Sequence, residues 1–255
     1  MPDFFISGDT LMETHKCNPI TTGCKGLDKI LGGGVKTREV TEVYGEFAAG
    51  KSQLAFQLSV NVQLPPERGG LCGKTIYIDT ENTFSPTRIV SMATALGLDP
   101  KVALSNIRLA RVKDVQEQIA VTDQAIEMVK MYPDEYKLLV VDSTTAHFRA
   151  EFLGRATLAV RQQTLNKYLH KLVALAESGD IAIYLTNQVL ARPDQFLDPI
   201  DAVGGNVLKH AAHVRMYLRK GKKGARIARI VDSPSLPEQQ APFLVTENGI
   251  IDFED

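Results

Sequence analysis

The sequence predicts an α/β domain built on a mostly parallel sheet with helices on both faces. Over the first two thirds, short apolar runs alternate with longer segments whose apolar residues recur every three or four positions, which is typical of strand–helix–strand units. The last third carries β-rich runs around turn signals such as Asn248-Gly249, which indicate antiparallel strands at one edge. We expect a linker or oligomerisation arm over residues 1–19 and one core domain over residues 20–255.

The individual elements can be justified in chain order. Glycines 32–34 end the first helix, Ser85-Pro86 supplies a cap and a proline at a helix start, and the run 137–142 reads as a strand buried on both faces. Polar loops are expected at 143–154 and 189–203, and the apolar residues of the arm should be buried somewhere. Strands are expected at 39–44, 75–79, 107–110, 137–142, 181–186, 213–219, 226–232, 243–246 and 250–253, and helices at 25–31, 51–62, 86–96, 114–131 and 157–178.

Composition excludes several classes of protein. The chain has 255 residues, 44% hydrophobic and 23% charged, as ordinary globular proteins have. A formal net charge of −1 excludes a globally basic nucleic-acid binder, so such contacts must come from local patches. Cys17, Cys24 and Cys72 show no Cys-x-x-Cys spacing, which argues against a disulfide framework or zinc site, and no run approaches the roughly 20 apolar residues of a membrane span. We therefore expect an intracellular protein without membrane contact.

A phosphate-binding motif organises the rest of the chain. A glycine, four residues and then Gly-Lys-Ser stand between a predicted strand and a predicted helix, where backbone N–H groups and the helix dipole attract anions. Lys51 would reach the β- and γ-phosphates, and the Ser52 hydroxyl would hold Mg²⁺. The alternative is a chance match on an ordinary loop. The predicted nucleotide-binding residues are Gly45, Glu46, Phe47, Ala48, Ala49, Gly50, Lys51, Ser52 and Gln53.

Three polar side chains stand at the ends of other predicted strands. Asp142 follows four apolar residues, where a carboxylate can hold Mg²⁺ through water, although it could also simply cap a turn. Glu81 could polarise a water for in-line attack on a γ-phosphate, and its alternative is a solvated loop residue. Gln188 could sense that phosphate and transmit its presence to the following loop, or merely satisfy the backbone of a turn.

Arginines in the loops after these strands suit contacts with phosphate groups. Arg149 and Arg155 lie in or beside the first loop and Arg192 in the second, and arginine pairs planar donors with phosphate oxygens. A basic segment follows. It could contact nucleic acid, or it could simply be a solvated face. Its members are Arg215, Arg219, Lys220, Lys222, Lys223, Arg226 and Arg229.

Longer motifs identify a family. The chain contains Val43-Tyr-Gly-Glu-Phe47, Tyr77-Ile-Asp-Thr-Glu-Asn-Thr-Phe84, Leu185-Thr-Asn-Gln188 and Asp232-Ser-Pro-Ser-Leu-Pro-Glu238. Further stretches lie at 20–23, 27–34, 62–66, 142–143, 154–155, 161–162, 204–206 and 217–221. Together they resemble the RecA-type strand-exchange recombinases, and specifically archaeal RadA and its eukaryotic counterparts, over about residues 4–252.

This resemblance implies a RecA-like P-loop NTPase fold and a catalytic set. It implies that Glu81 activates water, that Lys51 contacts the phosphates and that Gln188 senses the γ-phosphate. Ser52 and Asp142 would form the Mg²⁺ side of the site, and Arg88 would lie against the adenine. The implied function is a DNA-dependent ATPase that uses ATP and Mg²⁺ in homologous recombination and DNA repair.

The resemblance also implies contacts between chains and with DNA. Arg149, Arg155 and Arg161 match basic residues in and beside the first DNA-binding loop, and residues 189–203, with Arg192, match the second. Asp232 to Pro237 looks like the segment that caps ATP bound by a neighbouring subunit. The expected partners are single-stranded and double-stranded DNA, further copies of the chain in a filament or ring, and mediator proteins with Phe-x-x-Ala peptides. The expected location is the cytoplasm, near the nucleoid, in an archaeon, or the nucleus in a eukaryote.

Four departures from the family pattern define an alternative. The usual small N-terminal helix-hairpin-helix domain is missing, so we expect a short paralogue or a core excised from a longer protein. The Phe-x-x-Ala linker motif appears only as a weakened form from Phe4 or Phe5. Ala48 replaces a common glycine, which should be tolerated, and Asp201 adds negative charge to the second DNA loop, which should weaken DNA binding.

The alternative function is an ATP-binding module that binds partner peptides without filaments or strand exchange. Its expected peptide groove comprises Ala110, Val121, Ala125 and Met128. A hexameric ring helicase on the same core is a third interpretation, which the match at 232–238 disfavours.

Overall fold

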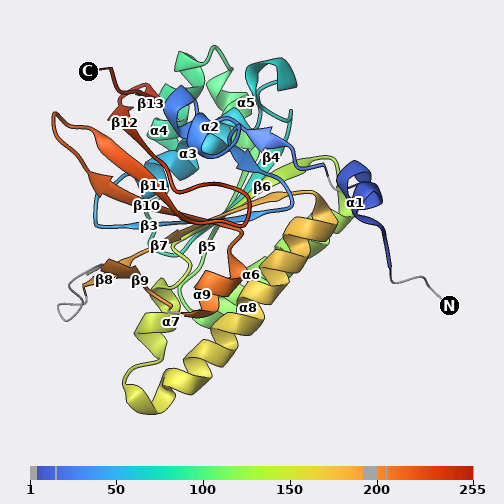
Figure 1. Cartoon of the computed structure of the whole chain (residues 1–255), viewed down its shortest axis with the longest axis vertical. Helices are drawn as coiled ribbons and strands as arrows, with labels where there is room; N and C mark the ends of the chain where they lie inside the picture. The colour runs from blue at the N-terminus through green and yellow to red at the C-terminus, as the bar shows by residue number, and fades with distance from the viewer. Residues whose placement is uncertain (1–4, 15, 192–199, 205, 255) are drawn as a thin grey trace.

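The computed structural model describes residues 5–14, 16–191, 200–204 and 206–254. Within these residues the chain forms a nine-stranded twisted sheet (Figure 1). Five neighbouring pairs, from β5 across to β10, are parallel, and the three pairs from β10 to β13 are antiparallel. The spatial order is β13 (Gly249–Asp252), β12 (Gln240–Thr246), β11 (Arg226–Asp232), β10 (Val214–Lys220), β3 (Val40–Gly45), β7 (Ala182–Asn187), β6 (Tyr136–Asp142), β4 (Lys74–Asp79) and β5 (Ile107–Arg111).

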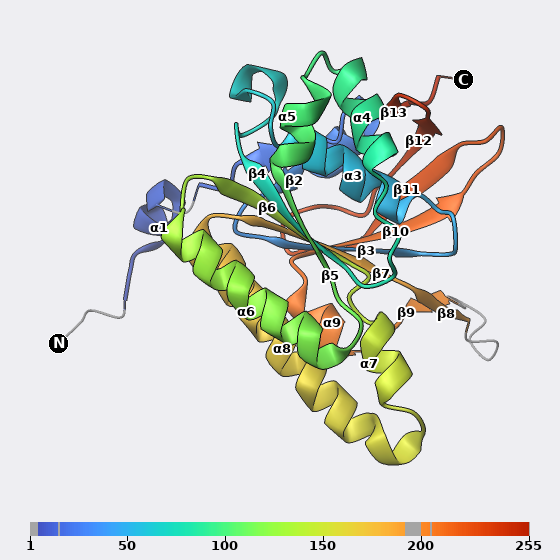
Figure 2. The ribbon, with the colours of Figure 1, turned by 180° about the vertical axis from the view of Figure 1, so that it is seen from behind.

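Helices cover both faces of this sheet, and each face has its own apolar cluster (Figures 1 and 2). On one face lie α2 (Lys25–Ile30), α3 (Lys51–Asn61), α4 (Pro86–Ala95) and α5 (Pro100–Ser105). On the other lie α6 (Val115–Met131), α8 (Leu158–Gly179) and α9 (Asn206–Ala211). The prediction of a mostly parallel sheet covered on both faces, with antiparallel strands at the C-terminal edge, is confirmed.

Short elements complete the described part of the chain. Two small antiparallel sheets pair β1 with β2 and β8 with β9. No helix among the described residues combines the length and the apolar character needed to span a bilayer. These elements are α1 (Gly8–Thr14), β1 (Pro19–Ile20), β2 (Val35–Lys36), the 3-10 turns η1 (Pro66–Arg68) and η2 (Arg155–Thr157), α7 (Ala146–Glu151), β8 (Val189–Ala191) and β9 (Ile200–Ala202).

The helix starts follow from local side-chain chemistry. The Ser85 hydroxyl accepts from the Arg88 N–H at the start of α4, and the Asp114 carboxylate accepts from the Glu117 N–H, 2.7 Å away, at the start of α6. Both bonds satisfy N–H groups that have no partner within the helix. Proline follows the cap in α4 and α5, where its missing N–H costs nothing.

Several short elements escaped the sequence prediction. The expected loop at 143–154 contains α7, and the expected loop after β7 begins with β8. Helices α5 and α9 were also not predicted, because helices of six residues show less than two turns of periodicity. Of the described apolar residues of the arm, Phe5 and Met12 are not buried against this chain, since they are 89% and 82% exposed.

The last strand is joined to the first core helix. Asp252 in β13 accepts hydrogen bonds through Oδ1 from the Gly26 N–H, at 3.0 Å, and from the Cys24 thiol, at 3.1 Å. Burial alone would raise the pKa of Asp252, but these bonds hold that pKa below its ordinary value. Burial raises the pKa of Cys24 to about 12, so this thiol stays protonated.

Candidate active site at the carboxyl edge of the sheet

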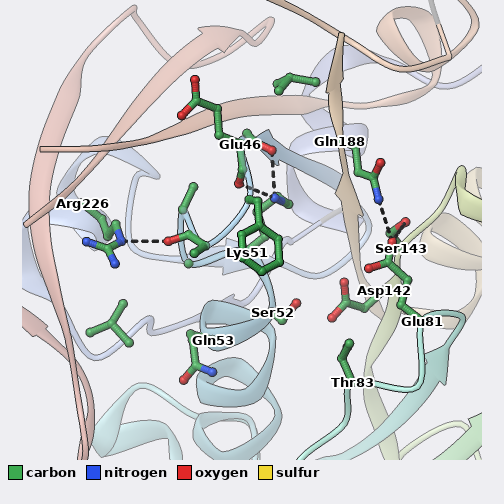
Figure 3. Close-up of a pocket in the computed structure, with 17 residues that line it drawn as sticks. Glu46, Lys51, Ser52, Gln53, Glu81, Thr83, Asp142, Ser143, Gln188 and Arg226 are labelled. Carbon is green, nitrogen blue, oxygen red and sulfur yellow. Dashed lines mark hydrogen bonds between the residues drawn. The ribbon is translucent and has the colours of Figure 1, made fainter.

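A cavity of about 620 Å³ lies where β3, β4, β6 and β7 end (Figure 3). These strands are direct neighbours in the order β3-β7-β6-β4 and run parallel, so the residues that follow them meet at one edge. The cavity is large enough for a nucleotide. The predicted residues that line it are Gly45, Glu46, Phe47, Ala48, Ala49, Gly50, Lys51, Ser52, Gln53, Glu81, Asp142 and Gln188.

The loop between β3 and α3 curls around its own lysine. Gly50 precedes the helix with a φ of 105°, a left-handed conformation that favours glycine. The Lys51 ammonium donates to the carbonyl oxygens of Gly45 and Glu46, both at 2.8 Å. Burial lowers the pKa of Lys51, whereas the carboxylates of Asp142 and Glu81 raise it. The ammonium group is thus held at the mouth of the loop, facing two carboxylates.

Ala48 occupies a left-handed position in this loop. Its φ is 60°, and its carbonyl accepts a hydrogen bond from the Arg226 Nε at 3.1 Å. A residue with a Cβ is strained in that region, whereas glycine is not. The loop therefore accommodates alanine at this position, but the Ala48 Cβ costs conformational energy that glycine would not.

Replacing Ala48 with glycine is expected to raise the free energy of unfolding by about 1 kcal/mol, because the left-handed strain is removed. The measurement is urea denaturation of both proteins. Ala49→Gly is the matched control, since Ala49 is not among the described residues with positive φ and glycine there should destabilise the fold. Equal destabilisation by both substitutions would contradict the explanation.

Asp142 is the buried carboxyl group of the site. It is 3% exposed and accepts hydrogen bonds from the Tyr77 hydroxyl, at 2.8 Å, and from the Thr186 hydroxyl. Burial raises its pKa, and hydrogen bonds from Thr186, Ser52 and Tyr77 oppose that rise. A carboxylate beside a serine hydroxyl is the all-oxygen set that Mg²⁺ prefers, so the residues present fit that ion.

A second group of side chains links Glu81 to the segment after β6, which is the predicted first DNA-binding loop. Glu81 Oε1 accepts from the Ser143 hydroxyl at 3.0 Å and from the Gln188 Nε2 at 2.8 Å (Figure 3). Arg149 on α7 donates to Gln188 Oε1 at 2.9 Å. The three predicted residues Glu81, Gln188 and Arg149 are therefore in one hydrogen-bonded chain, although they come from three different segments.

Other predicted residues lie away from the cavity. Arg88 does not line it, but donates to the Gln53 side chain at 2.9 Å and to the carbonyls of Thr246 and Glu247. Asp232, the last residue of β11, and Pro237, which follows that strand, are exposed, and Arg161 is half-buried on α8. The roles predicted for these residues involve a nucleotide, a neighbouring subunit or DNA, so they stay predictions.

Some predictions fall outside the described residues. Phe4 and Arg192 lie outside them, and the structure describes the backbone of Arg155 and Asp201 but not their side chains. Of the expected peptide groove, Ala110, Val121 and Met128 are half-buried, on β5 and α6. Ala125 is only 1% exposed, so the prediction that it lines a surface groove is wrong: its side chain packs into the core.

The basic segment does not form one solvated face. Arg215 is 3% exposed, and its Nε donates to the Glu42 carboxylate at 2.6 Å, because β10 pairs with β3 in the centre of the sheet. Arg226 lines the nucleotide-sized cavity, and Arg229 pairs with Glu238 at 2.9 Å. The side chains of Arg219, Lys220, Lys222 and Lys223 are exposed, as expected.

Five residues that line the cavity were not predicted to do so: Thr83, Ser143, Val189, Arg226 and Val245. Ser143 directly follows Asp142, and a hydroxyl next to a strand-end carboxylate was a signal that could have identified it. Arg226 lines the cavity from the antiparallel edge of the sheet, 178 residues from the carbonyl it contacts. No local pattern indicates that contact, because it depends on how the hairpin of β10 and β11 is placed.

Comparison with known proteins agrees with this geometry. The chain matches the model of the Rad51 family over residues 14–253. It is 52% identical to the DNA repair and recombination protein RadA of Aeropyrum pernix over 253 residues, which cover 99% of this chain and 79% of that protein. It is 53% identical to the protein of the same name from Metallosphaera sedula over 244 residues, 95% of this chain and 75% of that protein. The resemblance seen in the sequence is confirmed, and the chain belongs to the Rad51 family of RecA-type recombinases.

Proposed function

We propose that this chain is the DNA-dependent ATPase core of a homologous-recombination protein, which binds single-stranded DNA as a filament and promotes strand exchange. The observation that carries the proposal is the cavity itself. It collects Lys51, Ser52, Glu81, Asp142 and Gln188 from four neighbouring strand ends, in a chain 52% identical to a recombination protein. A phosphate loop, a buried carboxylate and an accessible carboxylate are the parts that nucleotide hydrolysis requires.

In this proposal ATP is the substrate and the loop residues bind its phosphates. The N–H groups at the start of α3 and the Lys51 ammonium neutralise charge on the β- and γ-phosphates. Ser52 would hold Mg²⁺ directly, and Asp142 would hold it through water. When bound, Mg²⁺ neutralises charge on the phosphate oxygens. Arg88, fixed by the turn between β12 and β13, would lie against the adenine.

Glu81 is the proposed general base. It is exposed at the cavity and its Oε1 is fixed by Ser143 and Gln188. It would take a proton from a water whose oxygen attacks the γ-phosphorus, while the bond from that phosphorus to the bridging oxygen breaks and leaves ADP. Gln188 cannot act as a base, so its role would be to report the γ-phosphate.

The link to DNA is the Arg149–Gln188 hydrogen bond of 2.9 Å. Arg149 lies on α7, within the proposed first DNA-binding loop, and Gln188 directly precedes the proposed second loop at 189–203. DNA phosphates that attract Arg149 would change the environment of Gln188 and Glu81, so DNA binding and hydrolysis would be thermodynamically linked. Asp232 and Pro237, both exposed, would cap ATP bound by a neighbouring copy.

The test is ATP hydrolysis by the folded chain with and without single-stranded DNA. We expect DNA to stimulate hydrolysis, and electron microscopy with ATP and single-stranded DNA to show filaments. The variant Lys51→Ala, purified in parallel, controls for contaminating ATPases. A folded protein that hydrolyses ATP at the same rate with and without DNA would refute the DNA-dependent ATPase.

A further inference from the structure

Beneath the candidate site lies a cluster of fully buried polar side chains. Glu42, Asn187 and Thr145 are 0%, 0% and 1% exposed, and Arg215 is 3% exposed. They come from β3, β7, the turn before α7, and β10. Buried polar groups are costly unless they are hydrogen-bonded, so the bonds of this cluster define what it does.

Asn187 is the centre of the cluster. Its Nδ2 donates to Glu42 Oε1 at 2.8 Å and to the Val203 carbonyl at 2.6 Å. Its Oδ1 accepts from the Thr145 hydroxyl at 2.7 Å and from the Gln188 N–H at 2.8 Å. These four bonds use the full capacity of a side-chain amide.

Glu42 determines which way this amide points. An ionised carboxylate only accepts hydrogen bonds, and so does the Val203 carbonyl, so the nitrogen must face them and the oxygen must face Thr145. The Arg215 Nε donates to Glu42 Oε2 at 2.6 Å, and its guanidinium carbon lies 5.1 Å from the centre of the Tyr44 ring. The charge on Glu42 is thereby balanced inside the sheet.

The amide joins the parts of the chain that flank the cavity. Gln188 follows Asn187 directly, and Val203 follows β9, so both ends of the β8–β9 segment are fixed by one side chain. The Val203 N–H also donates to the Gln188 carbonyl at 2.9 Å. Thr145 precedes α7 and makes no side-chain capping bond there, and its hydroxyl donates to Asn187.

We propose that Asn187, oriented by Glu42, is a positioning residue that aims Gln188 at the cavity and couples both DNA-binding loops to hydrolysis. This inference rests on the proposed function. Stability alone is a weak explanation for the cluster, because a buried ion pair contributes little compared with apolar packing, whereas it does select one arrangement of its neighbours. Each segment that Asn187 contacts, apart from β3, is one expected to meet DNA or nucleotide.

The substitution Asn187→Asp tests this with almost no change in volume. It replaces two donors by an acceptor that faces the Glu42 carboxylate and the Val203 carbonyl. We expect kcat for DNA-stimulated ATP hydrolysis to fall about 10- to 100-fold, as misplacement of a site residue does. KM for ATP should stay within about twofold, because no phosphate-loop atom is touched.

Asn61→Asp is the matched control. Asn61 is 1% exposed, donates to the Thr21 carbonyl at 2.7 Å and accepts from Gln57 at 2.8 Å, but it lies at the far end of α3. It should lower the melting temperature and leave the stimulation by DNA unchanged. If Asn187→Asp does not fold, Thr145→Val takes its place, because it removes one hydrogen bond to the same amide and should also lower the stimulation by DNA. Thr145→Ser keeps the hydroxyl and should restore that stimulation.

A double variant separates positioning from simple loss of structure. If Asn187 acts through Gln188, adding Asn187→Asp to Gln188→Ala should lower kcat no further than Gln188→Ala alone. Independent, additive losses would overturn the inference, as would a folded Asn187→Asp with wild-type stimulation. A wild-type chain that DNA does not stimulate would instead refute the proposed function, so the two failures are distinguishable.

Discussion

Glu81→Gln is expected to lower kcat for ATP hydrolysis by about 10²- to 10⁴-fold, the contribution of a positioned general base. The amide keeps the shape of the side chain and can still accept from Ser143, now bonded to Glu81 at 3.0 Å. It cannot take a proton from water. Steady-state hydrolysis at saturating ATP, with and without single-stranded DNA, measures the effect.

Nucleotide binding gives the control for this variant. The dissociation constant for ATP should stay close to that of the unmodified chain, because Lys51 and Ser52 are unchanged. Glu67→Gln removes an equal charge on the exposed turn η1, away from the cavity, and should leave kcat unaltered. If the Glu81→Gln variant keeps more than a tenth of the original kcat, a group other than Glu81 acts as the general base.

Glu42→Gln is expected to lower the free energy of unfolding by about 3–5 kcal/mol, because removal of one partner leaves a buried charge without its counter-ion. The Glu42 side chain is 0% exposed and that of Arg215 is 4% exposed in this pair. Adding Arg215→Met should restore much of the loss, since the double variant no longer buries that charge. Urea denaturation of the three proteins measures these energies.

The exposed pair Arg229–Glu238 is the control for this prediction. Its side chains are 46% and 66% exposed, and solvent screens the charges, so Glu238→Gln should cost less than about 1 kcal/mol. Similar losses for Glu42→Gln and Glu238→Gln would show that burial does not set the cost.

The sequence was most informative where short patterns dictate geometry. The residue pattern at 45–52 is typical of a loop between a strand and a helix, and the structure has β3 ending at Gly45 and α3 beginning at Lys51. Parallel strands end at a common edge, so Asp142, Glu81 and Gln188 could be expected together. Their convergence on one cavity is what the structure adds.

The sequence was least informative about residues whose surroundings depend on which strands lie side by side in the sheet. Arg215 belongs to a run of basic residues and was interpreted as part of that face, but strand pairing places it opposite Glu42, 173 positions away. The same holds for Asn187, to which no role was assigned from the sequence and whose contacts with Glu42 and Val203 come from distant segments. Local charge patterns cannot show which strand lies alongside, and six-residue helices such as α7 and α9 are too short to show a period.

The hydrogen bonds of Asp252 attach the C-terminal strand to the start of the core. Cutting the chain before this residue would free the first turn of α2 as well as the tail, since both the Gly26 N–H and the Cys24 thiol lose their acceptor. Because the pKa of Asp252 is lowered on folding, its contribution is fully present above the ordinary value of 3.8 and is lost as the pH falls through the lowered value. The hydrogen bonds that Asp252 accepts from the start of the core are therefore strongest at neutral pH, and they weaken as this carboxylate becomes protonated in acid.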